Sequence, residues 1–382
     1  MKIKLTAIAA MVASSLSIVA AEPTNQELLE LLKKQQAQIE ALIKKVEASE
    51  QKVEDTIGVV ESTMSQQSTS NSSFGGYGEM HYNNFEDKKT LDLHRFVLFF
   101  GHDFNDSTRF FSELEVEHAF IEGGAGGEVA IEQAYVEHDL SDTTSLKAGM
   151  FLVPVGLMNE THEPPTFYGV ERNLVEKNII PTTWREGGVN LTIKPQQGLA
   201  FDLAVSSGLY VDSSYKIRGG RQQLFKANAD SLAYTGRVKY SATPGLELAA
   251  TLQYQTDITQ GAEGVSATLI EAHAVYQNEA FTLKALYAGW DVDSDDAKVL
   301  GRDEQTGYYI EPSYKMNEKL GFFARFGAYD NEAGISADTE IKQTNVGLNY
   351  WLHENVVFKL DIEKLSGAQD ANGFNLGVGY MF

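Results

Sequence analysis

Apolar and polar side chains alternate along residues 74–382, and this period of two constrains the fold more than any other feature. In one segment, Leu246, Leu248 and Leu252 fall on one face, whereas Glu247 and Gln253 fall on the other. Segments of about ten residues, tilted in a closed sheet, are long enough to cross a bilayer. A soluble β-sandwich also alternates, but it packs two apolar faces together and usually has shorter strands. The alternation therefore predicts an all-β transmembrane barrel of 16 antiparallel strands.

The connections between these segments alternate between short and long, as in outer-membrane barrels. The chain also ends on an alternating segment whose last residue, Phe382, is aromatic, as in the recognition signal of bacterial outer-membrane barrels. The predicted strands begin near residues 74, 91, 109, 128, 145, 188, 199, 232, 246, 267, 281, 306, 320, 341, 356 and 373. Tight turns are predicted at 105–107, 141–144, 195–198, 242–245, 278–280, 316–319 and 353–355, and long loops at 157–187, 207–231, 257–266, 291–305 and 330–340.

Residues 1–21 have the pattern of a secretory signal peptide. Lys2 and Lys4 precede a mostly apolar run, and the small residues Ala20 and Ala21 suit a signal peptidase. The alternative is an uncleaved membrane anchor, although the apolar run is short and interrupted by hydroxyl residues. We therefore expect export from the cytoplasm and a place in the bacterial outer membrane.

Residues 22–64 predict an α-helical coiled coil in the periplasm, followed by a flexible polar linker at 65–73. The apolar residues Leu32, Ile39, Val46, Val53 and Val60 recur every seven residues, which forms one seam of a supercoiled helix. No second helix follows to cover this seam, so we expect self-association into a homotrimer. The alternative is a single helix laid on the surface of the protein. The coil either ties three protomers together or reaches the cell wall.

Composition and motifs argue against several other classes of protein. The net charge of −22 argues against binding nucleic acid, and the absence of cysteine excludes disulfides and thiolate-bound metals. The eight histidines show no metal-ligand spacing in the sequence, and His162 lacks the second histidine of a helical zinc motif. No serine lies in a nucleophile elbow. We therefore expect no enzymatic activity, no cofactor and no metal.

A barrel of 16 strands leaves a water-filled lumen, which the loop at 157–187 is predicted to narrow by folding inside. The alternative is that this loop forms a lid on the surface. Alternation directs these charged side chains into the lumen: Arg95, Arg109, Glu113, Glu115, Arg237, Lys239 and Arg325. The loop contributes Glu163, Glu171, Arg172 and Arg185, and it is net acidic. We expect the carboxylates of the loop to face basic wall residues, which would set up an electric field across the narrowest point of the channel. The alternative is that these charges merely pair with charges on neighbouring strands.

A second basic group, Lys216, Arg218, Arg221 and Lys226, falls in the predicted fourth external loop. It is a candidate for gathering anions at the mouth of the channel. Binding of lipopolysaccharide phosphates and plain solvation are the alternatives. In Arg218-Gly219-Gly220-Arg221, the glycines leave room for two guanidinium groups to approach one oxyanion.

Three segments resemble the phosphate-selective porin O/P family. They are Ser112–Ile121 (SELEVEHAFI), Glu128–His138 (EVAIEQAYVEH) and, most specifically, Gly149–Gly188, which begins GMFLVPVGLMNETHEPPTFYGVERN. The resemblance implies a trimeric outer-membrane porin of 16 strands, embedded in lipid and lipopolysaccharide. Phosphate-selective members have a pore lined by lysine and arginine, and the net acidic loop departs from that pattern.

The sequence as a whole predicts a porin for passive diffusion of small hydrophilic solutes or ions, including anions such as phosphate. The competing prediction is a structural tether or adhesin in which the barrel only anchors the coiled coil.

Overall fold

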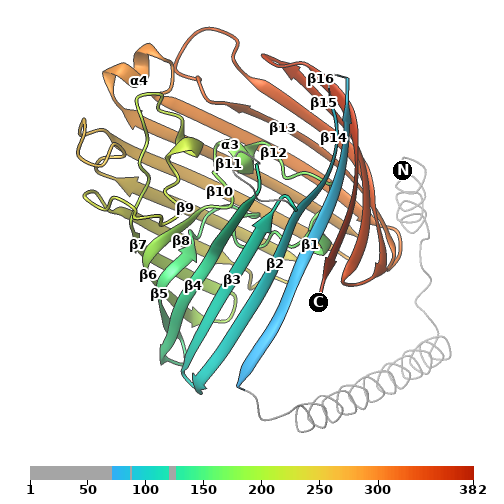
Figure 1. Ribbon diagram of the computed structural model, residues 1–382, viewed down its shortest axis with the longest axis horizontal. Helices are drawn as coiled ribbons and strands as arrows, with labels where there is room; N and C mark the ends of the chain where they lie inside the picture. The colour runs from blue at the N-terminus through green and yellow to red at the C-terminus, as the bar shows by residue number, and fades with distance from the viewer. Residues whose placement is uncertain (1–70, 87, 120–125) are drawn as a thin grey trace, which may run out of the picture. The chain divides into compact units, whose positions relative to one another are not determined.

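The computed structural model describes residues 71–86, 88–119 and 126–382, which form a closed antiparallel β-barrel of 16 strands (Figure 1). The predicted barrel and its strand count are therefore confirmed, and each strand begins within three residues of its predicted start. The strands are Ser72–Phe85 (β1), Lys89–Asn105 (β2), Thr108–Glu117 (β3), Glu128–Ser141 (β4), Thr144–Leu152 (β5), Arg185–Gln196 (β6), Leu199–Ser206 (β7), Ala233–Tyr240 (β8), Leu246–Gln255 (β9), Ser266–Asn278 (β10), Phe281–Asp293 (β11), Glu304–Lys315 (β12), Leu320–Asp330 (β13), Ile341–His353 (β14), Val356–Gly367 (β15) and Ala371–Met381 (β16).

The barrel closes where the first strand, β1, pairs with the last, β16. The register runs from Tyr77 opposite Met381 to Phe85 opposite Gly373. Just before this ladder, the amides of Gly76 and Phe382 each donate to the carbonyl of the other residue, both at 2.9 Å. Figure 1 shows the two strands side by side, β1 in blue and β16 in red. The C-terminal aromatic residue thus takes part in closing the sheet.

Strand β15 shows how the two faces of the barrel differ. Phe358, Leu360 and Ile362 point outward and are 47%, 37% and 65% exposed. Between them, Lys359 and Asp361 point inward and are buried. An apolar outer belt of this kind is stable against lipid tails, whereas charged side chains there would cost about 2–4 kcal/mol each at mid-membrane. None of the helices in the described residues is long and apolar enough to cross a membrane.

Short turns and long loops lie at opposite ends of the barrel, which we call the short-turn end and the long-loop end. Two predicted boundaries were wrong. The third long loop, L3, spans 153–184 instead of 157–187, because β6 pairs with β5 from Arg185 onward. The predicted linker ended at residue 73, but Ser72 and Ser73 already pair with β2. The predicted signal peptide and coiled coil lie outside the described residues.

Within the described part of the chain, four short helices lie in the long loops. They are Pro164–Thr166 (η2) and Val175–Asn178 (α3) in L3, Ile217–Gly220 (η3) in the fourth long loop, L4 (207–232), and Asp295–Val299 (α4) between β11 and β12.

The loops pack against the inner face of β10, β11 and β12, where inward positions are apolar. Leu269 and Trp290 are buried there with Ile179 and Trp184 of L3 and Leu209 of L4. The indole nitrogen of Trp290 donates to the carbonyl of Ile179 at 2.9 Å. On this side the interior is a hydrophobic core between the loops and the wall, which the sequence analysis did not predict. The sequence pattern missed it because these apolar residues contact loop residues far away in the chain.

Candidate functional site

Loop L3 crosses the inside of the barrel and is bonded to the wall at its far side. Arg325 on β13 donates from Nη2 to the carbonyl of Tyr168 at 2.8 Å. Asn349 on β14 donates to the carbonyl of Phe167 at 2.9 Å, and the amide of Val170 donates to Asp361 on β15 at 2.8 Å. These contacts hold the middle of L3 against β13, β14 and β15.

Glu176 on α3 ties the two limbs of L3 together and to the wall. Its Oε1 accepts hydrogen bonds from the amides of Leu157 and Met158, both at 2.6 Å. Its Oε2 accepts from Asn173 at 3.0 Å and from the hydroxyl of Tyr309 on β12 at 2.9 Å. With four hydrogen bonds, to both limbs of the loop and to the wall, this one carboxylate fixes much of the loop's path.

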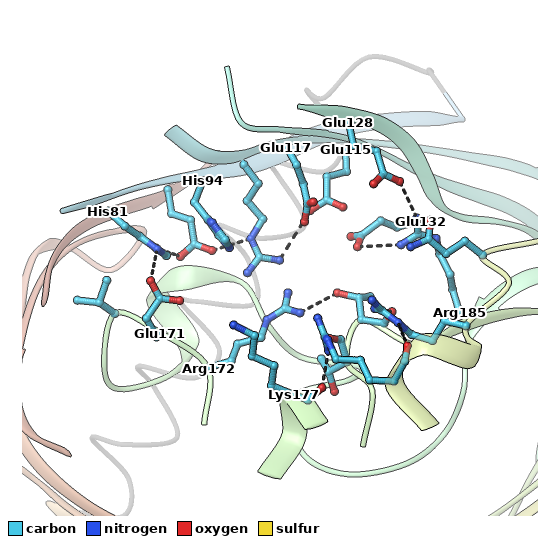
Figure 2. Close-up of a pocket in the computed structure, with 18 residues that line it drawn as sticks. His81, His94, Glu115, Glu117, Glu128, Glu132, Glu171, Arg172, Lys177 and Arg185 are labelled. Carbon is cyan, nitrogen blue, oxygen red and sulfur yellow. Dashed lines mark hydrogen bonds and ion pairs between the residues drawn. The ribbon is translucent and has the colours of Figure 1, made fainter. Parts of the chain in front are cut away.

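A cavity of about 250 Å³ remains between L3, L4 and strands β1 to β4, and charges of opposite sign line its two sides (Figure 2). The side formed by β3 and β4 is acidic. The opposite side, formed by L3, L4 and the start of β6, is basic. The acidic side consists of Glu115, Glu117, Glu128 and Glu132, and the basic side consists of Arg172, Lys177, Arg185, Arg218 and Arg221.

Three arginines of the basic side have no carboxylate partner among the residues that the structure describes. Arg172 donates to the hydroxyl of Thr183 at 2.9 Å, Arg218 to the carbonyl of Thr182 at 3.0 Å, and Arg221 to the carbonyl of Thr183 at 3.0 Å. Within the described residues, no carboxylate oxygen lies within 4.0 Å of their guanidinium groups. Burial lowers the pKa of all three, and the neighbouring charges of Arg218, Arg185 and Arg172 help to lower the pKa of Arg221 to about 10. The three form a cluster of like charge that an entering anion would stabilise.

A β-bulge creates the most buried acid of the opposite side. Between β3 and β4 the register passes from Glu113 opposite Gln133 to Leu114 opposite Ile131, which leaves Glu132 as the extra residue. Both Glu132 and Gln133 therefore face inward. Neither carboxylate oxygen of Glu132 has a hydrogen-bond partner among the described residues. The nearest cation is Arg185, at 3.5 Å, and Nε2 of His162 in L3 lies 3.6 Å from the other carboxylate oxygen.

A second bulge lies between β1 and β2. Glu79 pairs opposite Arg95 but Met80 pairs opposite Leu93, so His94 is the extra residue and faces inward beside Arg95. Arg95 donates from Nε to Glu79 at 2.6 Å. These side chains line the cavity next to its two charged sides.

His81 on β1 connects the wall to L3. Its Nε2 lies 3.1 Å from a carboxylate oxygen of Glu79, and its Nδ1 lies 3.0 Å from Glu171 of L3. Asn83 donates a further hydrogen bond to Glu171 at 2.8 Å. Burial alone would raise the pKa of Glu171. The bonds from His81 and Asn83 outweigh burial and hold this pKa well below its usual value. Glu171 is thus a docking residue that stays ionised near neutral pH.

Two groups among the described residues bring three potential metal ligands together. Their ligand atoms lie within 4.8 Å of one another. One group is buried where L3 meets the wall, and the other lies at the long-loop end. They consist of Glu113, Glu132 and His162, and of Asp92, His94 and His118.

Comparison with known proteins places this barrel in a family. A family model described as Gram-negative porin matches residues 187–370. A relative from Aquifex aeolicus (strain VF5), described as an uncharacterized protein, is 31% identical over 357 residues, which cover 81% of this chain and 80% of the relative. The chain belongs to the Gram-negative porins. As a member of this family with a closed barrel of 16 strands, the porin is a bacterial outer-membrane channel for small solutes.

Solved barrels share the fold of this porin at low sequence identity. OmpT of Vibrio cholerae is 13% identical with a TM-score of 0.59, over 83% of this chain and 99% of that chain. An anion-selective porin from Comamonas acidovorans is 12% identical with a TM-score of 0.61, over 82% and 100%. Salmonella typhi OmpF, in complex with daunomycin, is 17% identical with a TM-score of 0.60, over 82% and 98%. These likenesses show the fold.

The polarity of the porin's cavity is the reverse of the sequence prediction. We expected acidic residues of L3 to face basic residues of the wall. Instead, Arg172 of L3 faces Glu115 and Glu132 of the wall (Figure 2). The acids of L3 make other contacts. Glu171 is bonded to His81 of the wall, and Glu176 is bonded to both limbs of the loop and to Tyr309. Glu160 pairs with the wall residue Arg237, outside the cavity.

The structure brings some predicted pore residues together at the cavity and leaves others elsewhere. Glu113 is buried beside Gln133, Glu163 lies in L3 away from the cavity, and Arg185 belongs to β6 instead of L3. Of the predicted pore residues, the cavity is lined by Arg95, Glu115, Glu171, Arg172 and Arg185. It is not lined by Arg109, Glu113, Glu163, Arg237, Lys239 or Arg325.

Four of the predicted basic residues have other surroundings. Arg109 lies near the short-turn end, where it is paired with Asp139 at 2.8 Å, and Lys239 also lies toward that end of its strand. Arg237 is bonded to Asp202 at 2.7 Å and to Glu160 of L3. Arg325 is bonded to L3 and to Glu311 on β12, as described for the loop's anchors. Arg109 and Lys239 therefore lie away from the cavity.

The predicted basic group of L4 is divided by the fold. Arg218 and Arg221 line the internal cavity, whereas Lys216 and Lys226 are exposed to solvent outside it. The prediction of one anion-gathering patch at the mouth is therefore wrong. Between the two arginines, a Cβ at Gly219 would meet no atom within 4 Å, whereas a Cβ at Gly220 would lie 2.5 Å from Val211.

Several lining residues were missed by the sequence reasoning. His94 and Glu132 are the extra residues of two bulges, and a strict period of two does not predict where a bulge falls. His81 does follow the inward parity of β1, so alternation alone could have found it. Glu128 also follows the parity of its strand. Lys177 depends on the path of L3.

Proposed function

We propose that this porin is a passive diffusion channel that favours small anions, with phosphate among them. The observation that carries the proposal is the group of three cavity-lining arginines, Arg172, Arg218 and Arg221, without a carboxylate partner among the described residues. A guanidinium group offers parallel N–H donors that match the oxygens of phosphate. An anion in the cavity would relieve the repulsion among these three charges. Diffusion of this kind requires no catalytic residue, and none is proposed.

The opposing acidic side gives the cavity a transverse field. Two pairs of lining residues neutralise each other's charge locally. They are Glu79 with Arg95, and Glu171 with His81. Across the remaining space, five basic side chains face four acidic ones. Anions would therefore pass along the arginine side, and dipolar solutes would be oriented between the two sides. We expect a preference for anions and not a complete exclusion of cations.

Known proteins support parts of this proposal. The Comamonas acidovorans barrel that shares this fold is described as anion-selective. The resemblance of residues 149–188 to the phosphate-selective O/P porins points to the same solute class. Vibrio cholerae OmpT has been solved in a trimer form, and we propose that this porin is also a homotrimer.

The reversal potential in a salt gradient across a planar bilayer tests the anion preference. We expect Arg172→Ala and Arg221→Ala each to shift the reversal potential toward cation selectivity, because each removes an unpaired positive charge from the cavity. Inorganic phosphate should reduce the chloride current of the intact porin more than that of Arg221→Ala.

Arg109→Ala is the matched control, since it removes an arginine that is already paired with Asp139 away from the cavity. Equal reversal potentials in the intact protein, the two cavity variants and this control would contradict the anion preference. Negligible conductance of the intact protein would instead favour the tether or adhesin.

A further inference from the structure

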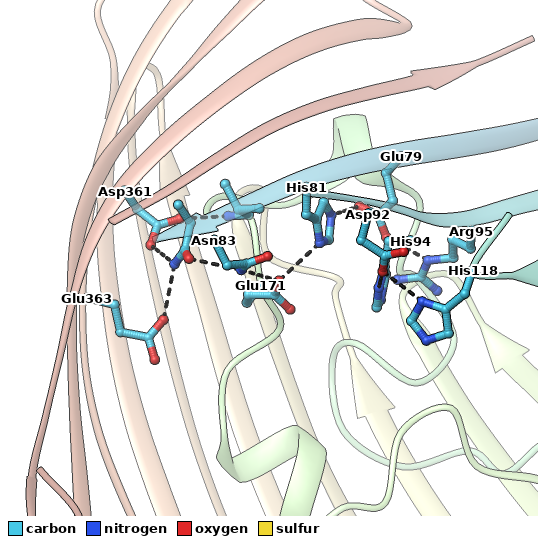
Figure 3. A network of polar contacts seen from close by, with 12 residues as sticks. Glu79, His81, Asn83, Asp92, His94, Arg95, His118, Glu171, Asp361 and Glu363 are labelled. Carbon is cyan, nitrogen blue, oxygen red and sulfur yellow. Dashed lines mark hydrogen bonds and ion pairs between the residues drawn. The ribbon is translucent and has the colours of Figure 1, made fainter. Parts of the chain in front are cut away.

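Three potential metal ligands meet at the long-loop end, outside the arginine side of the cavity (Figure 3). Asp92 and His94 lie on β2, and His118 directly follows β3. The Nδ1 atom of His118 lies 2.7 Å from Oδ2 of Asp92, and the Nδ1 atom of His94 lies 3.6 Å from the same oxygen. The three side chains converge on one point.

Two irregularities of the backbone create this convergence. His94 is the extra residue of the bulge between β1 and β2, so it faces inward on the same side as Asp92. His118 has a φ of 52°, a left-handed conformation that is uncommon outside glycine. Its amide donates to the carbonyl of His94 at 3.2 Å, which fixes the two histidines next to each other. Bulges and left-handed residues are often found at functional sites.

We propose that Asp92, His94 and His118 bind a divalent transition-metal ion, and that Zn²⁺ fits this donor set. Imidazole nitrogen and carboxylate oxygen are common zinc ligands, and three protein ligands leave a fourth position open for water or a solute. The side chains of Asp92, His94 and His118 are 30%, 31% and 43% exposed, so an ion can reach them. An ion pair between Asp92 and His118 alone would give no role to His94.

The site lies in a hollow of mixed charge. His81 stacks on His94 with ring centroids 4.6 Å apart, which supports the orientation of that ligand. The three ligands line a hollow of about 540 Å³ together with acidic and basic side chains, which are Glu171, Glu363, Lys88, Arg172 and Lys177. Asp92 carries the negative charge that offsets part of the ion's charge. A bound ion would lie beside the route into the cavity. Its charge would extend the basic side of the cavity toward the long-loop end.

Isothermal titration of the full-length porin in detergent with ZnCl₂ tests the site without relying on current. We expect Asp92→Asn and His118→Asn each to weaken Zn²⁺ binding by about tenfold or more, since even loss of an outer partner of a ligand costs roughly that much. Asparagine at residue 118 tolerates the left-handed conformation, so the backbone should persist. His138→Ala is the control, because His138 lies on β4 with Thr108 as its partner.

Binding is compared only among variants that migrate as folded barrels on unheated gels. Unchanged Zn²⁺ affinity in Asp92→Asn and His118→Asn would overturn the proposal. Loss of binding in Glu132→Gln, with binding retained in those two variants, would also overturn it, because the ion would then lie at Glu113, Glu132 and His162. The anion preference is measured separately, so either proposal can fail alone.

Discussion

At the scale of the residue, buried arginines fasten L3 to the barrel wall. Arg325 is 2% exposed and donates from Nε to Glu311 at 2.7 Å. Its two terminal nitrogens point to the carbonyls of Tyr168 and Glu171, at 2.8 and 3.4 Å. One guanidinium group thus satisfies a buried carboxylate on a strand and two peptide carbonyls on the loop. Arg237 has a similar arrangement with Asp202.

We expect Arg325→Ala to lower the free energy of unfolding by about 3–5 kcal/mol, because it leaves the buried carboxylate of Glu311 without its main partner. Lys284 is 3.9 Å from Glu311 and replaces little of that contact. Urea unfolding in detergent measures the loss, and the open-channel current should become noisier as L3 loosens. Arg302→Ala, which breaks an ion pair with Glu332 between two outer loops, should cost less. An equal or larger loss in that control would argue against the role of Arg325.

At the scale of the element, L3 behaves as a folded unit inside the barrel. Its first limb is bonded to its second limb through Glu176 and through Asn159, which donates to the carbonyls of Val153 and Trp184 at 2.8 and 3.0 Å. Its middle is bonded to β13, β14 and β15, and α3 packs on the hydrophobic core of the interior. Because L3 is fixed on several sides, the cavity beside it has a defined shape.

Glu176→Ala should loosen this unit. The amides of Leu157 and Met158 and the hydroxyl of Tyr309 would lose their acceptor, and each unsatisfied buried group costs about 1–3 kcal/mol. We expect a larger and noisier single-channel conductance and faster proteolysis within L3. Glu318→Ala, at an exposed short turn, is the matched control and should behave like the intact protein. Unchanged conductance and proteolysis in Glu176→Ala would show that L3 is held by other contacts.

At the scale of the whole molecule, residues 71–382 form one compact unit. The barrel closes on itself through β1 and β16 and builds its cavity from its own loops. The heptad repeat of 26–64 remains a sequence-based prediction of a coiled coil that strengthens the trimer.

Deletion of residues 26–64 should weaken trimers without abolishing conductance. The reason is that the heptad seam would contribute to association, whereas the cavity lies entirely in the barrel. Trimer stability is measured on gels at increasing temperature, and conductance is measured in planar bilayers. Trimers that dissociate at the same temperature with and without these residues would rule out the tethering role.

The sequence by itself determined the strands, their number, the closed barrel and which side chains face lipid, because these follow from a local period of two that a bilayer enforces on every strand. Only the tertiary structure decided the charged cavity. The bulges at His94 and Glu132 shift the alternation by one residue, and they depend on pairing between strands. The reversed polarity depends on where L3 and L4 dock, which is decided by contacts such as Arg325 with Tyr168 and Asp361 with Val170. Contacts between residues more than a hundred positions apart leave no periodic trace in a single sequence.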